Sequence, residues 1–411
     1  MASFDPDAAA APGSGIFGLP TSPEEARVIL IPVPFDATTS YRRGTAGGPR
    51  AILEASRQVD LFDREVGRPY QGGIAMLPIS SEIEQWNEEA SRAADPIIAA
   101  GGASDALAAN LAAVNGISER LNARVHETTR EWLSRGKLTA VVGGDHSTPY
   151  GAIQATSELH RGLGVLHVDA HADLRDAYEG FTHSHASIMR NVLTSLDGVA
   201  KLVQVGVRDF GEEEDEFRRS CGDRVSCHFD ADLARARVEG EAFGAVAGRV
   251  VAALPPLVYI SFDIDGLDPV LCPHTGTPVP GGLSWHEATY LIGAVVRSGR
   301  KIVGFDLNEV APGPEGDEWD ANVGARLLYK LIGWALKSWP SQDKTKKGPR
   351  RREPFFAHSV SGGGWRLREA GSHKRRRKRP CSADRERPSR SSTGGRCRTP
   401  SGRPGRSRSR T

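Results

Sequence analysis

The hydrophobic positions along the chain gather in short β-branched runs, and three of these runs end in a cluster of polar residues. The three runs lie at 138–142, 163–168 and 257–262. Their length and nearly continuous apolar character are typical of strands in a parallel sheet, where both faces of a strand are buried. The sequence therefore predicts a buried parallel strand at each of the three places.

Between the runs, apolar residues recur at steps of three and four, which is the spacing of one face of a helix. The clearest example is 104–136, which we expect to begin at Ser104 or Asp105 and to end at Gly136. Its apolar positions are Leu107, Leu111, Val114, Ile117, Leu121 and Val125. Because strands alternate with helices, we predict an α/β fold with helices on both faces of a central parallel sheet, a three-layer α/β/α sandwich.

The polar clusters that follow the runs contain residues of metal-ligand type. They read Gly143-Gly144-Asp145-His146-Ser147, Asp169-Ala170-His171-Ala172-Asp173 and Ser261-Phe262-Asp263-Ile264-Asp265. In an extended chain, side chains at i, i+2 and i+4 point to the same side and can converge. The C-terminal ends of parallel strands share one edge of the sheet, where active sites of such folds are built. We therefore predict one shared site from His146, Asp169, His171, Asp173, Asp263 and Asp265.

Carboxylates and imidazoles without thiolates suit hard or borderline divalent ions. A carboxylate-rich pair of sites favours manganese, with nickel, cobalt and iron as open alternatives. Four aspartates balance the charge of two divalent ions, so the expected cofactor is two Mn²⁺ per subunit. A water between two such ions loses a proton near neutral pH, which would supply a nucleophile. Any one cluster alone is equally well a strand end with solvated carboxylates, but three in the same context favour a metal site.

The motifs Gly-Gly-Asp-His, Asp-Ala-His-x-Asp and Ser-x-Asp-x-Asp-x-x-Asp-Pro occur here in that order. They resemble the metal motifs of the ureohydrolases, the family of arginase, agmatinase and their relatives. The resemblance runs from Val33-Pro34-Phe35-Asp36 to the helix-like segment 327–334, roughly three quarters of the chain. It implies a hydrolase that cleaves a guanidino compound to urea and an amine, and a central sheet of about eight strands.

The resemblance also implies roles for individual residues. One ion would be held by His146, Asp169, Asp173 and Asp263, and the other by His171, Asp169, Asp263 and Asp265. His185 resembles the family histidine that exchanges protons at the substrate, and Glu309 resembles the carboxylate that grips the guanidinium group. Asp173 would pass a proton to the leaving amine. His167 shares a strand face with Asp169, but we interpret it as a core residue or a neighbour of the ligands.

The stretch 174–183, directly after the second metal motif, is expected to contact the tail of the substrate. It lacks the Asn- and Ser-rich pattern of arginases. This stretch and the amino-terminal segment 34–41 look most like the agmatinase branch, which implies agmatine as substrate and putrescine as the polyamine product. Asp176 or Glu179 would then suit the terminal ammonium group, unless either is a solvated loop charge. Arg175 favours a carboxylate tail instead, as in guanidinobutyrate, guanidinopropionate or formiminoglutamate, unless it only pairs with Asp176 or Asp173. Arginase activity is a further alternative.

Composition is that of a globular enzyme. The 411 residues are 39% hydrophobic and 25% charged, and no apolar run approaches the ~20 residues of a membrane helix. The first residues lack the basic and apolar regions of a secretory signal, so we expect a cytoplasmic protein. We expect a flexible segment at 1–24, a catalytic domain at 25–340 and a tail at 341–411. Relatives commonly form trimers or hexamers, so the resemblance implies a homo-oligomer.

The chain changes character near residue 340. Segment 341–411 has 23 Lys and Arg against 5 Asp and Glu, whereas 1–340 has 30 against 46. A basic tail with few apolar residues should be disordered. Its tracts at 374–380 and 406–410 resemble nucleic-acid-binding or nuclear-import sequences, which leaves a nucleic-acid-binding protein as an alternative function. A tail rich in Arg, Pro, Gly and Ser also fits a frameshifted or read-through end that is irrelevant to function.

Overall fold

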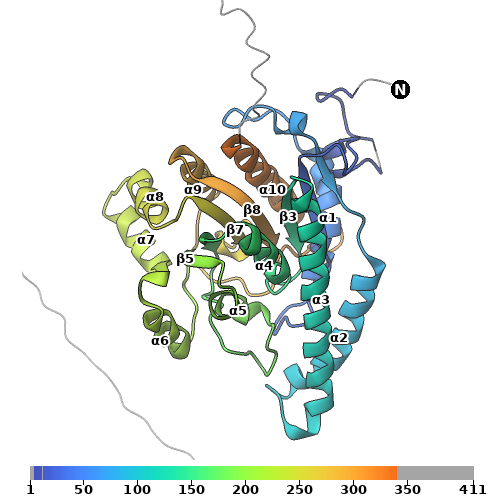
Figure 1. Cartoon of the computed structure of the whole chain (residues 1–411), viewed down its shortest axis with the longest axis vertical. Coiled ribbons are helices and arrows are strands. Elements are labelled where there is room, and N and C mark those ends of the chain that lie inside the picture. Colours follow the sequence, from blue (N-terminus) through green and yellow to red (C-terminus); the bar gives the residue numbers. More distant parts are fainter. Residues whose placement is uncertain (1–3, 12, 340–411) are drawn as a thin grey trace, which may run out of the picture. The chain divides into compact units, whose positions relative to one another are not determined.

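A central sheet of eight parallel strands lies between two layers of helices (Figure 1). The computed structural model describes residues 4–11 and 13–339; the tail 341–411 and its basic tracts lie outside these residues. The strand order is β2-β1-β3-β8-β7-β4-β5-β6. The strands are β1 (Val28–Val33), β2 (Ile74–Met76), β3 (Leu138–Gly143), β4 (Leu163–Val168), β5 (Val199–Val205), β6 (Val225–His228), β7 (Leu257–Asp263) and β8 (Lys301–Asn308). This confirms the predicted three-layer α/β/α sandwich and its sheet of eight strands.

Consecutive side chains of a strand point to opposite faces, and in β1 both faces are buried. Val28 and Leu30 pack with Ile52 of α1, whereas Ile29 and Ile31 belong to a second core. Helices α1 and α7–α10 cover one face of the sheet, and α2–α5 cover the other. The helices are α1 (Gly48–Ala55), α2 (Ser81–Ala99), α3 (Ala108–Ser134), α4 (Tyr150–Leu159), α5 (Ile188–Ser195), α6 (Glu212–Ser220), α7 (Asp230–Val238), α8 (Phe243–Ala252), α9 (Trp285–Arg297) and α10 (Trp319–Ser338).

Helices α2 and α3 form a long antiparallel hairpin that extends beyond the sheet (Figure 1). Helix α3 was expected over 104–136, but the α-helix begins only at Ala108. A 3-10 turn over Asp105–Leu107 precedes it, because the amide of Leu107 donates to the carbonyl of Ser104, three residues back. The predicted end is correct, since Gly136 has φ +73°, the left-handed conformation that terminates helices.

The strand order decides where polar residues meet. Strands β3, β8, β7 and β4 are consecutive in the sheet although they are distant in sequence, and β5 lies next to β4. All strands run in the same direction, so the residues after each strand gather along one edge of the sheet. The sheet therefore brings the three polar clusters of the sequence to one place.

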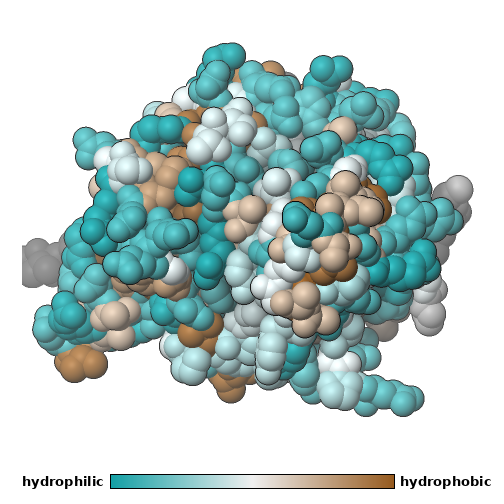
Figure 2. Space-filling view, turned by 90° about the horizontal axis from the view of Figure 1, so that it is seen from below, coloured by the Kyte–Doolittle hydropathy of each residue, from teal (hydrophilic) through white to brown (hydrophobic). Residues whose placement is uncertain are grey.

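The outside of the protein is largely hydrophilic on the face shown in Figure 2, where hydrophobic residues form small separate groups. Within residues 4–11 and 13–339, none of the helices combines the length and the apolar character needed to cross a bilayer.

Candidate metal centre

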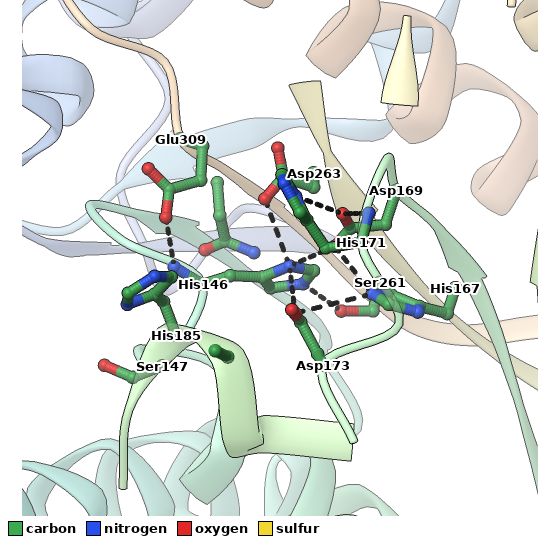
Figure 3. Close-up of polar contacts among 12 residues, drawn as sticks. His146, Ser147, His167, Asp169, His171, Asp173, His185, Ser261, Asp263 and Glu309 are labelled. Carbon is green, nitrogen blue, oxygen red and sulfur yellow. Dashed lines mark hydrogen bonds and ion pairs between the residues drawn. The ribbon is translucent and has the colours of Figure 1, made fainter. Parts of the chain in front are cut away.

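His146 lies in the middle of the buried cluster (Figure 3). It follows β3 in a tight loop: a Cβ at Gly144 would lie 2.0 Å from the backbone oxygen of Phe35, so only glycine fits there. The ring atom Nδ1 of His146 faces three carboxylates, at 2.8 Å from Asp169, 3.3 Å from Asp173 and 3.2 Å from Asp263. The loop after β3, the loop after β4 and the end of β7 thus converge on one imidazole nitrogen.

The other nitrogen of His146 fixes which tautomer the ring adopts. Nε2 lies 2.9 Å from Oγ of Ser261, and this hydroxyl donates to Asp306 at 3.0 Å. Because the hydroxyl proton is used for Asp306, Ser261 accepts the proton on Nε2 of His146. Nδ1 is then the nitrogen that is free to bind a cation among the three carboxylates.

A second imidazole, that of His171, faces the same cluster from the loop after β4. Its Nδ1 lies 3.4 Å from Oδ1 of Asp169 and 3.1 Å from Oδ2 of Asp265. The two oxygens of Asp169 therefore face different histidines, Oδ2 toward His146 and Oδ1 toward His171. Asp169 is thus placed between the two imidazoles. Asp263, also expected to bridge, contacts the His146 side through Oδ2, and its Oδ1 accepts the amide of Asp265.

His167 is close to the cluster as well, with Nε2 at 2.8 Å from Oδ2 of Asp169. The amide of Gln204 donates both to Nδ1 of His167 and to the carbonyl oxygen of Ala172. The proton of the His167 ring is consequently on Nε2, where it is donated to Asp169. Although His167 has the spacing of a metal ligand, its protonated nitrogen points at the cluster, so we interpret it as a residue that orients Asp169.

The composition of the cluster fits a pair of cations. Asp169, Asp173, Asp263 and Asp265 are all buried, and buried carboxylates need a positive partner to remain charged. Without ions, burial together with the nearby Asp169 raises the pKa of Asp173 to about 8. Burial and Asp265 likewise raise the pKa of Asp263 well above its usual value. Two groups of side chains are close enough to hold an ion: His146, His167, Asp169 and Asp173, and Asp169, His171 and Asp265.

Glu309 follows β8 and has a free carboxylate oxygen beside the cluster. Its Oε1 accepts the backbone amide of His146 at 2.9 Å (Figure 3). Its Oε2 is buried and has no hydrogen-bond partner among the described residues. Burial, and after it the carboxylate of Asp145, raises the pKa of Glu309 well above its usual value. A cationic hydrogen-bond donor would relieve both the unpaired oxygen and the raised pKa.

His185 lies on the other side of the entrance to the cluster. Its amide donates to Oγ1 of Thr38 at 3.2 Å, and that hydroxyl donates to the buried Asp145 at 2.7 Å. Burial, with the nearby His171, lowers the pKa of His185 to about 4, so its ring is neutral at pH 7. Nδ1 of His185 is buried and unpaired within the described part of the chain.

A cavity of about 460 Å³ opens from the cluster to solvent. Segments from the N-terminal region, the loops after β4 and β5, and the loop before α9 enclose it. Its lining comprises Ser40, Tyr41, Arg42, His171, Asp173, Arg175, Tyr178, His185, Ala186, Asp209, Phe210, Glu214, Thr277, Pro278 and Val279. The cavity is large enough for a small elongated molecule whose head reaches His171 and Asp173.

A model of the arginase family matches residues 26–333. The chain belongs to this family. Over 320 residues it is 35% identical to the N(1)-aminopropylagmatine ureohydrolase of Thermus thermophilus, covering 77% of this chain and 94% of that one. It is 31% identical over 317 residues to the mitochondrial guanidino acid hydrolase of Homo sapiens, covering 76% and 79%. The solved agmatine ureohydrolase of Thermoplasma volcanium matches with a TM-score of 0.61 and 27% identity, covering 79% and 94%.

Family membership confirms the resemblance inferred from the three motifs. The protein is a ureohydrolase of the agmatinase-like branch, a hydrolase that acts on guanidino C–N bonds. Its residues of metal-ligand type are gathered in one buried cluster.

In this ureohydrolase, only one of the three residues predicted to contact the tail of the substrate lines the cavity. Arg175 lines the cavity, but its Nε lies 3.5 Å from the buried Glu214 and its guanidinium stacks on Tyr178. Asp176 is 88% exposed, pairs with Arg190 and is not part of the lining. Glu179 is also outside the lining, in a turn with φ +56°.

Other residues of the cavity were not singled out from the sequence. Asp209 follows β5 and is the one exposed carboxylate in the lining, and Tyr41 and Phe210 present aromatic surface near it. A usable signal existed, because Arg208-Asp209-Phe210 comes directly after an apolar run of the same kind as those before the metal motifs. The position of Tyr41 beside these residues arises only from folding.

Proposed function

We propose that this ureohydrolase is a dinuclear manganese enzyme that hydrolyses a guanidino amine, such as agmatine or N(1)-aminopropylagmatine, to urea and the corresponding polyamine. The proposal rests on the observation that each oxygen of Asp169 faces a different histidine within a buried group of four aspartates. The proposed ligands are His146, Asp169, His171, Asp173, Asp263 and Asp265. Manganese is proposed over zinc because carboxylates outnumber imidazoles.

The two ions, when bound, would supply Lewis acidity and lower the pKa of a water held between them. The protein side chains supply the remaining functions. The free Oε2 of Glu309 accepts N–H groups of the guanidinium ion, which holds the electrophilic carbon next to the cluster. This anchoring is needed because the delocalised charge makes the guanidinium carbon a poor electrophile.

Asp173 and His185 are the side chains that transfer protons. As a carboxylate beside the proposed ions, Asp173 can take up the proton released from water and deliver it to the departing nitrogen, so that the amine leaves in neutral form. His185 lines the cavity together with Asp173, and its unpaired Nδ1 can accept a proton and return it. The C–N bond of the guanidino group breaks, and the oxygen of water ends in urea.

The charges of the cavity favour a cationic tail. The side chain of Asp209 makes no hydrogen bond or ion pair with any described residue, whereas the charge of Arg175 is opposed by the buried Glu214. Tyr41 and Phe210 offer faces on which methylene groups and ammonium ions pack. The relative from Thermus thermophilus carries a name for a substrate with a longer polyamine tail than agmatine, and the cavity of about 460 Å³ has room for such a tail.

A guanidino acid is the second candidate, and Arg42 supports it. Its guanidinium lines the cavity and makes a hydrogen bond to the carbonyl oxygen of Pro273 and a contact to the exposed Tyr41. An arginine without a carboxylate partner at this entrance could bind the carboxylate of guanidinobutyrate or guanidinopropionate. The human relative is named for this substrate class.

Urea release separates the two candidates. The manganese-loaded protein would be supplied with agmatine, N(1)-aminopropylagmatine, arginine, 4-guanidinobutyrate and 3-guanidinopropionate. We expect the highest kcat/KM with one of the two amines, and a loss of about tenfold for that amine in Asp209→Asn. Highest kcat/KM with a guanidino acid, together with loss of its binding in Arg42→Gln, would replace the first candidate by the second. The homo-oligomer implied by the resemblance is also proposed, and light scattering of the purified protein tests it.

A further inference from the structure

The loop that carries Arg175 and Tyr178 into the cavity turns back on itself at a tight β-turn. The amide of Tyr178 donates to the carbonyl of Phe181 at 3.2 Å, and the amide of Phe181 donates to that of Tyr178 at 2.8 Å. The two central residues, Glu179 and Gly180, have φ +56° and +97°. Positive φ at both central positions is that of a type I′ turn, which suits glycine at the second position but is unfavourable for glutamate at the first. Contacts with residues outside the turn support this conformation.

The tip of the α2–α3 hairpin provides this support through apolar packing. Phe181 is fully buried in a small core that it shares with Ala94 and Ile97 of α2 and Val114 of α3. The turn also fits closely against the tip, because a Cβ at Gly180 would lie 2.7 Å from that of Ala103. This core is separate from the cores that pack on the sheet. The loop beside the cavity is therefore anchored to the hairpin by its own hydrophobic cluster.

A side-chain amide of α3 fixes the backbone on both sides of Phe181. Nδ2 of Asn115 donates to the carbonyl of Gly180 at 3.4 Å, and Oδ1 of Asn115 accepts the amide of Thr182 at 3.1 Å. One amide group thus satisfies a donor and an acceptor of the loop, which fixes its direction as well as its distance from α3. Three residues before Phe181, Tyr178 stands edge-on to His185, with ring centroids 5.9 Å apart, and stacks on Arg175.

We propose that the α2–α3 hairpin is a positioning element for the substrate tail, acting through Asn115 and Phe181 on the place of Tyr178 and Arg175 in the cavity wall. Asn115 and Phe181 do not line the cavity, so they are positioning residues. Glu309 and the proposed ligands after β4, which would hold the head group, are not members of the hydrophobic cluster at the hairpin tip. Disturbing the tip should therefore affect tail binding and leave head-group binding intact. This inference rests on the proposed function, because it takes the cavity to be the site of the tail.

The test uses the full-length, metal-loaded protein with Asn115→Leu, which removes both hydrogen bonds at nearly constant size. Gly180→Ala is a second variant, since the positive φ disfavours alanine and its Cβ would lie 2.7 Å from that of Ala103 and 3.1 Å from the side chain of Leu111 in α3, which displaces the turn from the hairpin. The matched control is Asn110→Leu on the same helix, whose Nδ2 donates to the carbonyl of Ala93 in α2 and does not touch the loop. The measurements are amide hydrogen exchange of 174–183, KM and kcat for agmatine and N(1)-aminopropylagmatine, and the inhibition constant of guanidinium ion as the isolated head group.

We expect Asn115→Leu and Gly180→Ala to speed exchange in 174–183 and to raise KM for the tailed substrates about tenfold. The inhibition constant of guanidinium and the bound manganese should stay unchanged, and Asn110→Leu should match the wild type in every readout. Unchanged exchange in both variants would overturn the inference. So would faster exchange with unchanged KM, or an equal loss of guanidinium binding. A wild-type protein that releases no urea from any guanidino compound would instead refute the proposed function. Hydrogen exchange does not depend on activity, so it would still test whether the hairpin positions the loop.

Discussion

Two side chains at the centre depend on backbone conformations that residues other than glycine rarely adopt. Asp173 has φ +55° and Glu309 has φ +61°. Such conformations are unfavourable by ~1–3 kcal/mol and persist where surrounding contacts hold them. At Glu309 these contacts are its amide, which donates to Gly144, and its carbonyl, which accepts Oγ1 of Thr275. The strain turns both carboxylates toward the cluster, away from the direction that an extended strand end would give them.

Glu309→Gln tests the role of the unpaired oxygen. The amide side chain can still accept the backbone N–H of His146 but cannot form a charge-assisted hydrogen bond to guanidinium. A loss of ~3 kcal/mol for such a bond corresponds to a fall of about 100-fold in kcat/KM for the preferred substrate. Steady-state urea release gives the value, and metal analysis should show unchanged manganese. A variant with more than half of the wild-type kcat/KM would remove Glu309 from the site.

Asp169→Ala tests whether one carboxylate serves two ions. Because its two oxygens face His146 and His171, removing Asp169 should lower manganese from two ions per subunit to one or none, and turnover should fall at least 100-fold. The control is Asp268→Asn at the end of the third motif, Ser-x-Asp-x-Asp-x-x-Asp-Pro, where the carboxylate accepts the amide of Val270 outside the cluster. Elemental analysis gives the number of manganese ions per subunit. Retention of two ions in Asp169→Ala would contradict the proposed role of Asp169 in a dinuclear centre.

At the scale of elements, ion pairs connect α10 to the loop before β2. Nζ of Lys330 lies 2.6 Å from Asp63 and 2.9 Å from Glu65. Burial alone would raise the pKa of Asp63, but the ammonium of Lys330 and the backbone amides of Val66 and Glu65 together outweigh this effect, so the pKa lies below its usual value. A carboxylate with a lowered pKa stabilises the fold above its unfolded pKa, and this stabilisation is lost as the pH falls through the folded pKa.

Lys330→Met should therefore lower the free energy of unfolding by ~1 kcal/mol at pH 7, a modest value because the pair is partly exposed and screened. The difference from the wild type should shrink as the pH falls below about 4 and Asp63 takes up a proton. Urea unfolding at several pH values measures it, and Asp63→Asn combined with Lys330→Met isolates the pair. A difference that is the same at pH 3 and pH 7 would show that lost packing, and not charge, is responsible.

The strands and their polar ends were predictable from the sequence because a buried parallel strand has a local signature. The runs at 138–142 and 163–168 became β3 and β4 nearly residue for residue. The beginning of α3 was misplaced because a 3-10 turn and an α-helix share their apolar positions. The cavity wall was the least predictable part, since Tyr41 and Asp209 meet only through the fold and the pairing of Arg175 with Glu214 spans 39 positions.

At the scale of the whole molecule, charge is divided between two parts of the chain. Residues 1–340 carry 30 basic against 46 acidic side chains, and 341–411 carry 23 against 5. The match to the arginase family ends at residue 333, before the basic part begins. An acidic body attracts cationic substrates over a distance of about a Debye length, so kcat/KM for an amine substrate should be higher at low salt.

Deletion of 341–411 tests whether the basic part takes part in catalysis. The truncated protein keeps Trp339, whose indole donates to the carbonyl of Ile302. We expect urea release within about twofold of the full chain, and we expect any salt-sensitive binding of nucleic acid to disappear. Loss of activity in the truncated protein, with an unchanged melting temperature, would assign the segment a role in the enzyme.

The pairing of neighbouring strands has a consequence for how the protein assembles. Val168 pairs with Phe262 across β4 and β7, and the proposed ligands Asp169 and Asp263 are the next residues. If β7 slipped by one residue against β4, every side chain of β7 would change faces and Asp263 would leave the cluster. Only a correctly aligned sheet brings the proposed ligands together. Metal binding would therefore favour this alignment over the other alignments that the chain can sample. The proposed metal centre would thus stabilise the correctly aligned sheet relative to misaligned ones. Recovery of bound ions after refolding would then show that the strands have paired in the native register.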